Sequence, residues 1–300
     1  MESSIQGKMI RELIAHFSSD LLIGKKIKNG DLRKKLVNVE PRWRCPEGFS
    51  WTEIQMKDFT MDWLVPEENN REKVVLQLHG GGYIAGMRNA YRTFGVVYSE
   101  LGGNISVLTP DYRVAPEHPF PAALEDALAA FDWLLAQGYA EEDIILAGDS
   151  AGGGLVMSLC FLLRQRKRKL PCGIVAMSPW TDLTKSGKSY QTRSSVDPVL
   201  DHEYLDRMIE NYAGGMELTN PYISPLFGKL EGLPPVYIQV GDNELLLSDS
   251  TQLHKNLVKA DVSARIDIYK GMWHVFQMSP LKNAYDAMNK IAEFIFDICR

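Results

Sequence analysis

The 300-residue sequence has few cysteines, no long apolar run and no excess of basic charge. The four cysteines are far apart and none belongs to a C-x-x-C pair: Cys45, Cys160, Cys172 and Cys299. This excludes a dense disulfide framework and favours free thiols in a reducing compartment. The longest nearly continuous apolar run, residues 155–163, is shorter than the roughly 20 residues that a membrane-spanning helix needs.

Charge and the first residues narrow the class of protein further. The 33 basic and 38 acidic residues give a net charge of −5, so no global field draws the protein to nucleic acid or to an anionic membrane. The opening sequence, MESSIQGKMIRELIAHF, lacks the apolar core of a signal peptide. We therefore expect a cytoplasmic protein with no nucleic-acid partner and no membrane span. The subunit count is left open, a homodimer included.

Short apolar runs alternate with helical patterns along most of the chain. The apolar runs predict strands, at residues 74–78, 105–108, 144–147, 174–177, 236–240 and 264–269. Patterns of helical period predict helices, at residues 122–137, 155–163, 245–260 and 281–298. Residues 54–63 fit two antiparallel edge strands. Repeated strand–helix units imply an α/β fold, with a mostly parallel, eight-stranded sheet and helices on both faces.

Two stretches interrupt this alternation. Residues 1–45 precede the first sheet pattern and contain an amphipathic helical pattern at residues 4–17. Residues 185–225 contain a helical pattern at residues 201–212 and a proline-rich exit. We therefore predict a single domain over residues 1–300, with a helical cap formed by about 1–45 and about 185–225.

One stretch predicts a nucleophile. Residues 143–155, DIILAGDSAGGGL, describe a buried strand, a tight turn and a helix, with Ser150 at the apex of a G-x-S-x-G pattern. Glycines beside a strained turn let the strand and the helix approach each other. The start of the helix directs backbone N–H groups toward the group that the serine attacks. A glycine-rich loop that serves only the fold is the alternative interpretation.

A serine hydroxyl needs a base, which in an open α/β sheet lies beyond the carboxyl end of a strand. The sequence has six histidines: His16, His79, His118, His202, His254 and His274. His274 follows the strand at residues 264–269 by a short loop and precedes the last helix. Its position predicts that it is the base.

The base in turn needs an orienting acid, which we expect after the strand at residues 236–240. Three carboxylates follow that strand: Asp242, Glu244 and Asp249. Asp249 is already about a helical turn further on, which suits the site less well. The sequence barely separates the other two, and we favour Glu244, with Asp242 second.

The attacked carbonyl also needs donors for the oxyanion that forms on it. The sequence His79-Gly80-Gly81-Gly82 follows the buried strand at residues 74–78. Residues without side chains can turn their N–H groups into the site. Together with the N–H group of Ala151 at the start of the helix, they would complete an oxyanion hole.

Three stretches of the sequence together carry a family resemblance: HGGGY at 79–83, YRVAPEHPFPAALEDA at 112–127 and GDSAGGG at 148–154. They resemble the hormone-sensitive-lipase-like branch of the α/β-hydrolases, mostly small bacterial carboxylesterases. The resemblance runs from about Val74 to the C-terminus and includes SPWTDL at 178–183 and KGMWHVF at 270–276.

The resemblance implies roles for individual residues. It implies Ser150 as nucleophile, His274 as base, and three oxyanion donors, Gly81, Gly82 and Ala151. It implies that His79 holds the glycine loop. The order Ser150, Glu244, His274 is the one expected of α/β-hydrolases.

The sequence departs from the family at the acid. Many members carry a D-P-L-x-D segment whose first aspartate is the triad acid, whereas this chain reads Glu244-Leu245-Leu246-Leu247-Ser248. Alignment places Glu244 on that aspartate. The family also implies a cap that limits acyl size. We therefore expect hydrolysis of short-chain esters through an acyl-enzyme, without a metal or an organic cofactor.

Other functions account for less of the sequence. Gly80, Gly82 and Ala85 satisfy a loose dinucleotide-binding fingerprint, which leaves the GDSAG turn and His274 unexplained. His202-Glu203 resembles the start of a zinc motif but lacks the second histidine. A ligand-binding receptor that has lost catalysis, and an amidase or arylformamidase using the same triad, remain alternative functions.

Overall fold

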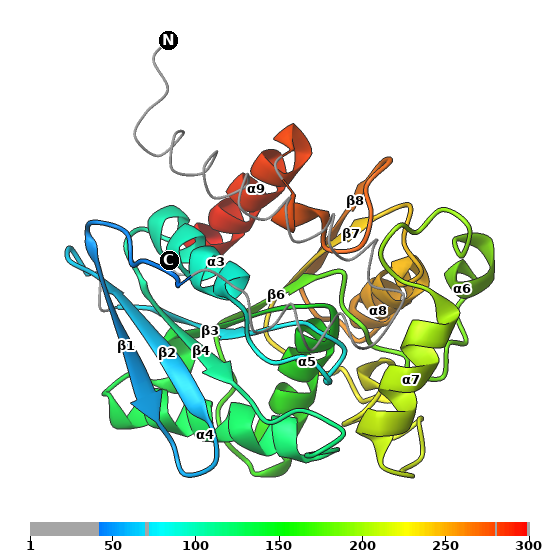
Figure 1. The fold of residues 1–300 in the computed structure, drawn as a ribbon, viewed down its shortest axis with the longest axis horizontal. Helices are drawn as coiled ribbons and strands as arrows, with labels where there is room; N and C mark the ends of the chain where they lie inside the picture. Colours follow the sequence, from blue (N-terminus) through cyan, green and yellow to red (C-terminus); the bar gives the residue numbers. More distant parts are fainter. Residues whose placement is uncertain (1–41, 70–71, 280, 299–300) are drawn as a thin grey trace.

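The computed structural model describes residues 42–69, 72–279 and 281–298. Its centre is one eight-stranded sheet in the order β1-β2-β4-β3-β5-β6-β7-β8 (Figure 1). The strands are β1 (Phe49–Gln55), β2 (Thr60–Pro66), β3 (Val74–Leu78), β4 (Ser106–Asp111), β5 (Ile144–Asp149), β6 (Gly173–Met177), β7 (Val236–Gly241) and β8 (Ala264–Tyr269). The prediction of an α/β fold with a mostly parallel, eight-stranded sheet is therefore confirmed.

The character of each strand explains its place. Every residue of β3, β5, β6 and β7 is buried, as expected of parallel strands covered on both faces. The six strands β3 to β8 run parallel to one another, whereas β2 runs antiparallel to both of its neighbours, β1 and β4. β2 lies between β1 and β4, so of the two antiparallel strands predicted at the edge only β1 is an edge strand.

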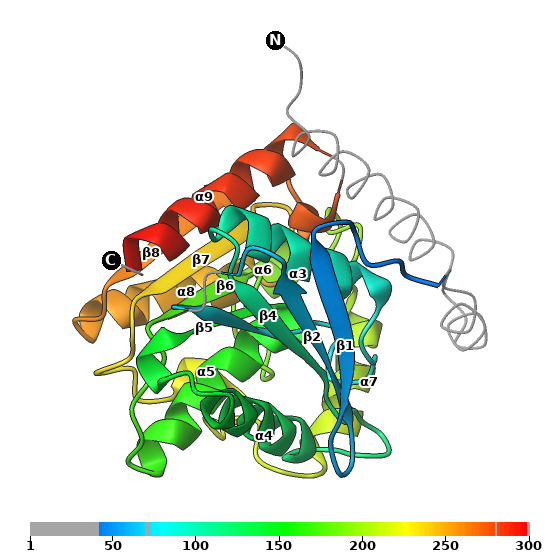
Figure 2. The ribbon, with the colours of Figure 1, turned by 90° about the vertical axis from the view of Figure 1, so that its left-hand side faces the viewer.

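Helices cover both faces of the sheet (Figure 2). α3 (Asn89–Leu101) and α9 (Lys282–Ile298) pack on one face. The other face carries α4 (Ala122–Ala136), α5 (Ser150–Gln165) and α8 (Leu247–Lys259). All of these helices except α3 were expected from the sequence, with boundaries that differ by a few residues. The buried Phe94, Val97 and Tyr98 place α3 against the sheet.

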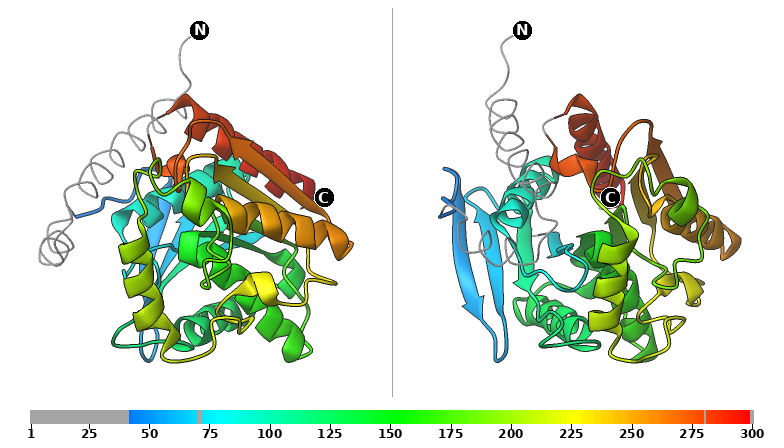
Figure 3. Two further views of the ribbon diagram at one scale, coloured as in Figure 1. Left: turned by 90° about the vertical axis from the view of Figure 1, so that its right-hand side faces the viewer. Right: turned by 45° about the vertical axis from the view of Figure 1, so that its right-hand side comes forward.

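The segment 185–225 forms α6 (Ser189–Thr192) and α7 (His202–Ala213) and ends at the short helix η2 (Pro225–Phe227). Figure 3 shows α7 at one end of the sheet. The Asp201 side chain accepts a hydrogen bond from the Tyr204 N–H group at the start of α7, and Gly214 ends the helix in the left-handed conformation. The single domain and its cap stay a prediction, and the N-terminal part of that cap, residues 1–41, lies outside the described residues.

The parallel strands end at a common edge, where residues of several loops meet. His79 follows β3, Ser150 follows β5, Ser178 follows β6 and Glu244 follows β7. In the described part of the chain no helix is both long and apolar enough to cross a membrane. Cys45 and Cys160 are free thiols, as expected.

Candidate active site

Ser150 lies at a turn that only side-chain-free neighbours permit. Its φ of 50° is in the left-handed region, an uncommon conformation for a residue other than glycine. The space that a Gly152 side chain would need is filled by the carbonyl groups of Leu78 and His79. The corresponding space at Gly148 is filled by the backbone of Gly152. β5, α5 and the loop after β3 can therefore pack together at this point.

A continuous chain of hydrogen bonds joins Ser150, His274 and Glu244. The Ser150 Oγ lies 2.9 Å from Nε2 of His274, and Nδ1 of that ring lies 3.0 Å from Oε2 of Glu244. All three residues are buried. The carboxylate fixes the tautomer, because Nδ1–H donates to it and leaves Nε2 free to accept the Ser150 proton. The structure thus brings together three residues that the sequence placed on separate segments.

The electrostatics of His274 favour its charged form. Burial lowers the pKa of the imidazole, but the hydrogen bond that the ring donates to Glu244 and the charge of that carboxylate outweigh burial. Asp197 and Asp149 act in the same direction, and the pKa of His274 is raised overall. The ring is therefore surrounded by groups that stabilise an imidazolium ion.

The three carboxylates that follow β7 have different partners. Glu244 is fully buried, and its Oε1 accepts hydrogen bonds from Ser178 Oγ at 2.9 Å and from the Gly241 N–H group at 2.5 Å. Asp242 instead accepts from the Gly271 N–H group at 2.6 Å in an exposed contact. Asp249 accepts from two backbone N–H groups of the loop after β6. Of the three, Glu244 is the one that contacts His274.

The glycine loop lies against the start of α5. Gly81 and Gly82 have φ values of 117° and 64°, which side-chain-bearing residues rarely adopt. The Gly81 carbonyl accepts hydrogen bonds from the N–H groups of Ile84 and Ala85, which closes the turn. Ala151 lies in the first turn of α5, where N–H groups have no partner within the helix. The three predicted oxyanion donors therefore belong to two segments in direct contact.

His79 is packed as an uncharged ring. It stacks on Tyr112 with 4.0 Å between ring centroids, and its Nδ1 donates to the Gly80 carbonyl at 2.8 Å. The Tyr112 hydroxyl donates to the His79 carbonyl at 2.5 Å. Burial lowers the pKa of His79. These contacts link the glycine loop to the loop that follows β4.

Asp149 ties the end of β5 to the loop at residues 79–83. Its Oδ1 accepts a hydrogen bond from the Gly80 N–H group at 3.0 Å, and its Oδ2 accepts one from the Tyr91 hydroxyl at 3.1 Å. A side chain at Gly80 would collide with this carboxylate. Burial raises the pKa of Asp149 to about 6. The sequence did not indicate that the partner of Asp149 is the loop after β3.

Ser178 is a functional neighbour that sequence reasoning missed. Its hydroxyl donates to Glu244 and accepts from the Val275 N–H group at 3.1 Å, so it touches both Glu244 and the residue after His274. Its φ of 45° is also left-handed. The sequence did carry one signal for Ser178. It follows the carboxyl end of β6, and β6 lies between the strands that precede Ser150 and Glu244.

Two other motif residues have structural partners. Arg113 makes a two-pronged ion pair with Asp126, and so belongs to the internal scaffold of the fold. The His202 ring contacts the Tyr190 carbonyl at 2.8 Å. Within the described residues, no group of three or more histidine, cysteine or acidic side chains could hold a metal ion.

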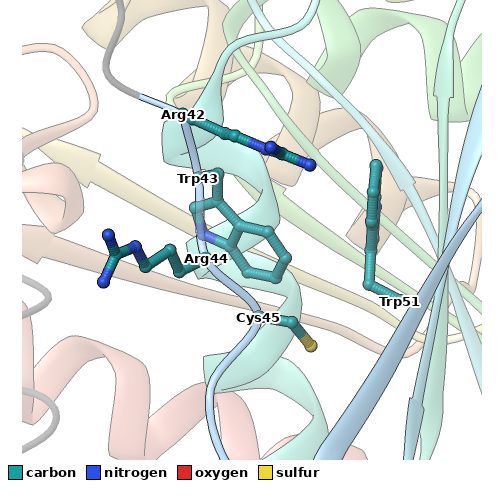
Figure 4. Close-up of a pocket in the computed structure, with 5 residues that line it drawn as sticks. All are labelled: Arg42, Trp43, Arg44, Cys45 and Trp51. Atoms are coloured by element: carbon teal, nitrogen blue, oxygen red, sulfur yellow. The ribbon is translucent and has the colours of Figure 1, made fainter.

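A separate hollow lies where the described chain begins (Figure 4). It has a volume of about 700 Å³ and is lined by Arg42, Trp43, Arg44, Cys45 and Trp51. The Trp43 and Trp51 rings meet edge to face with centroids 6.1 Å apart. None of the predicted site residues lines this hollow.

Comparison with known proteins supports the family resemblance. A family model described as the alpha/beta hydrolase fold matches residues 75–278. An esterase of Acinetobacter venetianus is 36% identical over 227 residues, covering 74% of each chain. An acetyl-hydrolase of Streptomyces hygroscopicus is 39% identical over 275 residues, covering 90% of this chain and 88% of that one. The crystal structure of an esterase from the bacterial hormone-sensitive lipase family aligns with a TM-score of 0.85 and 31% identity over 100% of both chains.

The raised pKa of Asp149 predicts a pH-dependent stability difference for D149N. The unfolded carboxyl ionises at about pH 4, whereas the folded one stays protonated to about pH 6. Wild-type stability from this group is therefore present below about pH 4 and lost as the pH rises to about 6. The amide does not ionise. The free energy of unfolding of D149N relative to wild type should thus rise by up to about 3 kcal/mol between pH 4 and pH 7.

Urea unfolding of both proteins across that pH range checks this expectation. D149N can still accept from the Gly80 N–H group and donate to the Tyr91 hydroxyl, so the comparison isolates the charge. A difference between the two proteins that does not change with pH contradicts it.

Proposed function

Because the chain belongs to the α/β-hydrolase family, in its hormone-sensitive-lipase-like branch, we propose that it hydrolyses short-chain carboxylic esters through Ser150, His274 and Glu244. The protein is a carboxylic ester hydrolase, and the proposal concerns its residues and substrate range. One observation carries the assignment of residues: the buried hydrogen-bond chain from the Ser150 hydroxyl through His274 to Glu244.

The first step forms an acyl-enzyme. The Ser150 Oγ attacks the ester carbonyl carbon while His274 Nε2 takes the hydroxyl proton. Glu244 holds the ring in the required tautomer and stabilises the imidazolium ion that forms. The N–H groups of Gly81, Gly82 and Ala151 would donate to the oxyanion of the tetrahedral intermediate. Loss of one such donor typically costs about 100- to 1000-fold in rate.

Collapse of the intermediate and hydrolysis complete the cycle. The ester C–O bond breaks while His274 gives its proton to the leaving oxygen. The leaving group then departs as the alcohol. A water molecule then attacks the acyl-enzyme, with His274 again accepting the proton. The second intermediate releases the carboxylic acid and restores the Ser150 hydroxyl. Every group in this sequence of steps comes from the chain, the ester or water.

The packing of α7 supports a limit on acyl length. The buried Met208 side chain occupies the space that a side chain at Gly82 would need. The next residue of the loop, Tyr83, stacks on Tyr212 of the same helix with 3.7 Å between centroids. α7 therefore covers the glycine loop closely. We infer that Met208 and α7 restrict the space beside the oxyanion donors to short acyl groups.

Two alternatives use the same fold. A receptor that has lost catalysis would not need Ser150 and His274 in hydrogen-bond contact, so this contact disfavours it. An amidase or arylformamidase would use the same acyl-transfer chemistry on a different leaving group. Parallel assays on p-nitrophenyl acetate, acetanilide and N-formyl-aniline separate these substrates.

Substitution of the three residues tests the proposed mechanism. S150A and H274A should each lower kcat/KM on p-nitrophenyl acetate by at least about 10⁴-fold, because either change removes the proton transfer. E244A should lower it by about 10³- to 10⁴-fold, because the imidazole loses its tautomer and its counter-charge. The matched control D242A should cost less than about 10-fold, since Asp242 contacts the Gly271 backbone rather than the ring.

Circular dichroism should show that all four variants remain folded. Near-wild-type turnover by folded S150A would refute the role of this serine. A larger loss in D242A than in E244A would transfer the acid role to Asp242.

The acyl-length limit predicts a specific profile. Among p-nitrophenyl esters, kcat/KM should be highest from acetate to butyrate and fall by at least about 10-fold at octanoate. M208A should raise the octanoate-to-acetate ratio of kcat/KM, because it enlarges the space beside Gly82. The matched control M216A changes an exposed methionine of the same segment and should leave the ratio unchanged. A wild-type profile that stays flat to dodecanoate contradicts the inferred limit.

A further inference from the structure

The segment between β6 and β7 is bonded directly to the loop that carries Glu244. We propose that Asp197 is a positioning residue that couples this segment to the His274–Glu244 pair: it anchors the backbone beside Glu244 and places a second carboxylate near the ring. This inference deepens the proposed function and rests on it.

The carboxylate of Asp197 accepts three backbone hydrogen bonds. Its Oδ2 accepts from the Leu245 N–H group at 2.8 Å, across 48 residues of chain. Its Oδ1 accepts from the N–H groups of Val199 and Leu200 at 2.8 and 3.0 Å. Hydrogen bonds to a charged acceptor are stronger than neutral ones. Asp197 therefore organises its own turn and at the same time holds the chain that follows β7.

The bond to Leu245 acts on the peptide unit that follows Glu244. The other backbone group of Leu245, its carbonyl, accepts from Ser189 Oγ at 2.5 Å. Ser189 and Ser248 also exchange two hydrogen bonds, each 2.8 Å long, between the backbone N–H of one and the hydroxyl of the other. Both backbone groups of Leu245 are thus held by the segment between β6 and β7. A shift of that segment would move the Glu244 backbone, and with it the carboxylate that contacts His274.

The charges that face His274 come from three separate elements. Among these carboxylates, Glu244 in the loop after β7 raises the pKa of His274 most. Asp197 in the segment between β6 and β7 is next, and Asp149 at the end of β5 follows. Burial lowers the pKa of His274, and these three carboxylates raise it. Asp197 consequently favours the imidazolium ion that forms when Ser150 loses its proton.

The neutral variant D197N tests the proposal. The amide keeps an oxygen that can accept a hydrogen bond but carries no charge. We measure kcat/KM on p-nitrophenyl acetate from about pH 5 to pH 9, where the acid limb reports the pKa of the free enzyme's base. Loss of the negative charge lowers the pKa of His274, so the midpoint of this limb should move to lower pH by roughly half a unit. The plateau should fall by about 3-fold, because half a pKa unit of lost imidazolium stabilisation corresponds to that factor in rate.

Two matched variants separate charge from anchoring. S189A removes hydrogen bonds to Leu245 and Ser248 without changing a charge, so it should lower the plateau and leave the midpoint in place. D201N removes an aspartate of the same segment whose contact is the start of α7, and should change neither quantity. If the midpoint of D197N coincides with that of wild type, or if D201N shifts it equally, the proposal is wrong.

A second readout does not depend on ester turnover. In protein labelled with ¹³C-histidine, the His274 resonance is identified by its absence in H274Q, and its titration gives the pKa directly. A lower His274 pKa in folded D197N supports the coupling, whatever the activity of S150A. Retained activity in S150A would refute only the proposed function. An unchanged pKa overturns the coupling even where hydrolysis proceeds as proposed.

Discussion

The site depends on one buried chain of hydrogen bonds, in which a carboxylate, an imidazole and a hydroxyl from three segments meet. Removing the Glu244 carboxylate from water is costly unless strong donors replace the water. Ser178, Gly241 and His274 supply those donors. The same burial strengthens the effect of Glu244 on His274, because the dielectric constant around the pair is low. The geometry and the electrostatics of the site therefore have a common origin.

Close backbone packing makes this arrangement possible. The glycine loop, the end of β5 and the start of α5 approach so closely that side chains at Gly80, Gly148 or Gly152 would collide with neighbouring atoms. Asp149 then joins two of these segments through the Gly80 N–H group. Glycines that would weaken an ordinary strand or helix are here the condition for placing backbone donors beside a hydroxyl.

Much of the fold could be predicted from the sequence, because buried parallel strands are short apolar runs and polar motifs follow their carboxyl ends. That rule also explains why Ser150, His274 and Glu244 could be proposed before their contacts were known. The choice between Glu244 and Asp242 could not be made in this way, since both belong to one short loop and the direction of each side chain depends on Ser178 and Gly271. Asp197 could not be found at all, because its partner Leu245 lies 48 residues away. The catalytic roles and the cap remain proposals.

Covalent labelling tests the central claim most directly. Diethyl p-nitrophenyl phosphate reacts with an activated serine, which displaces p-nitrophenolate and keeps the diethylphosphoryl group. Peptide mass spectrometry should find one such group per chain, on Ser150, and H274A should slow its formation strongly because the hydroxyl loses its base. Stoichiometric labelling of another residue, or labelling of Ser150 at the same rate without His274, would contradict the account.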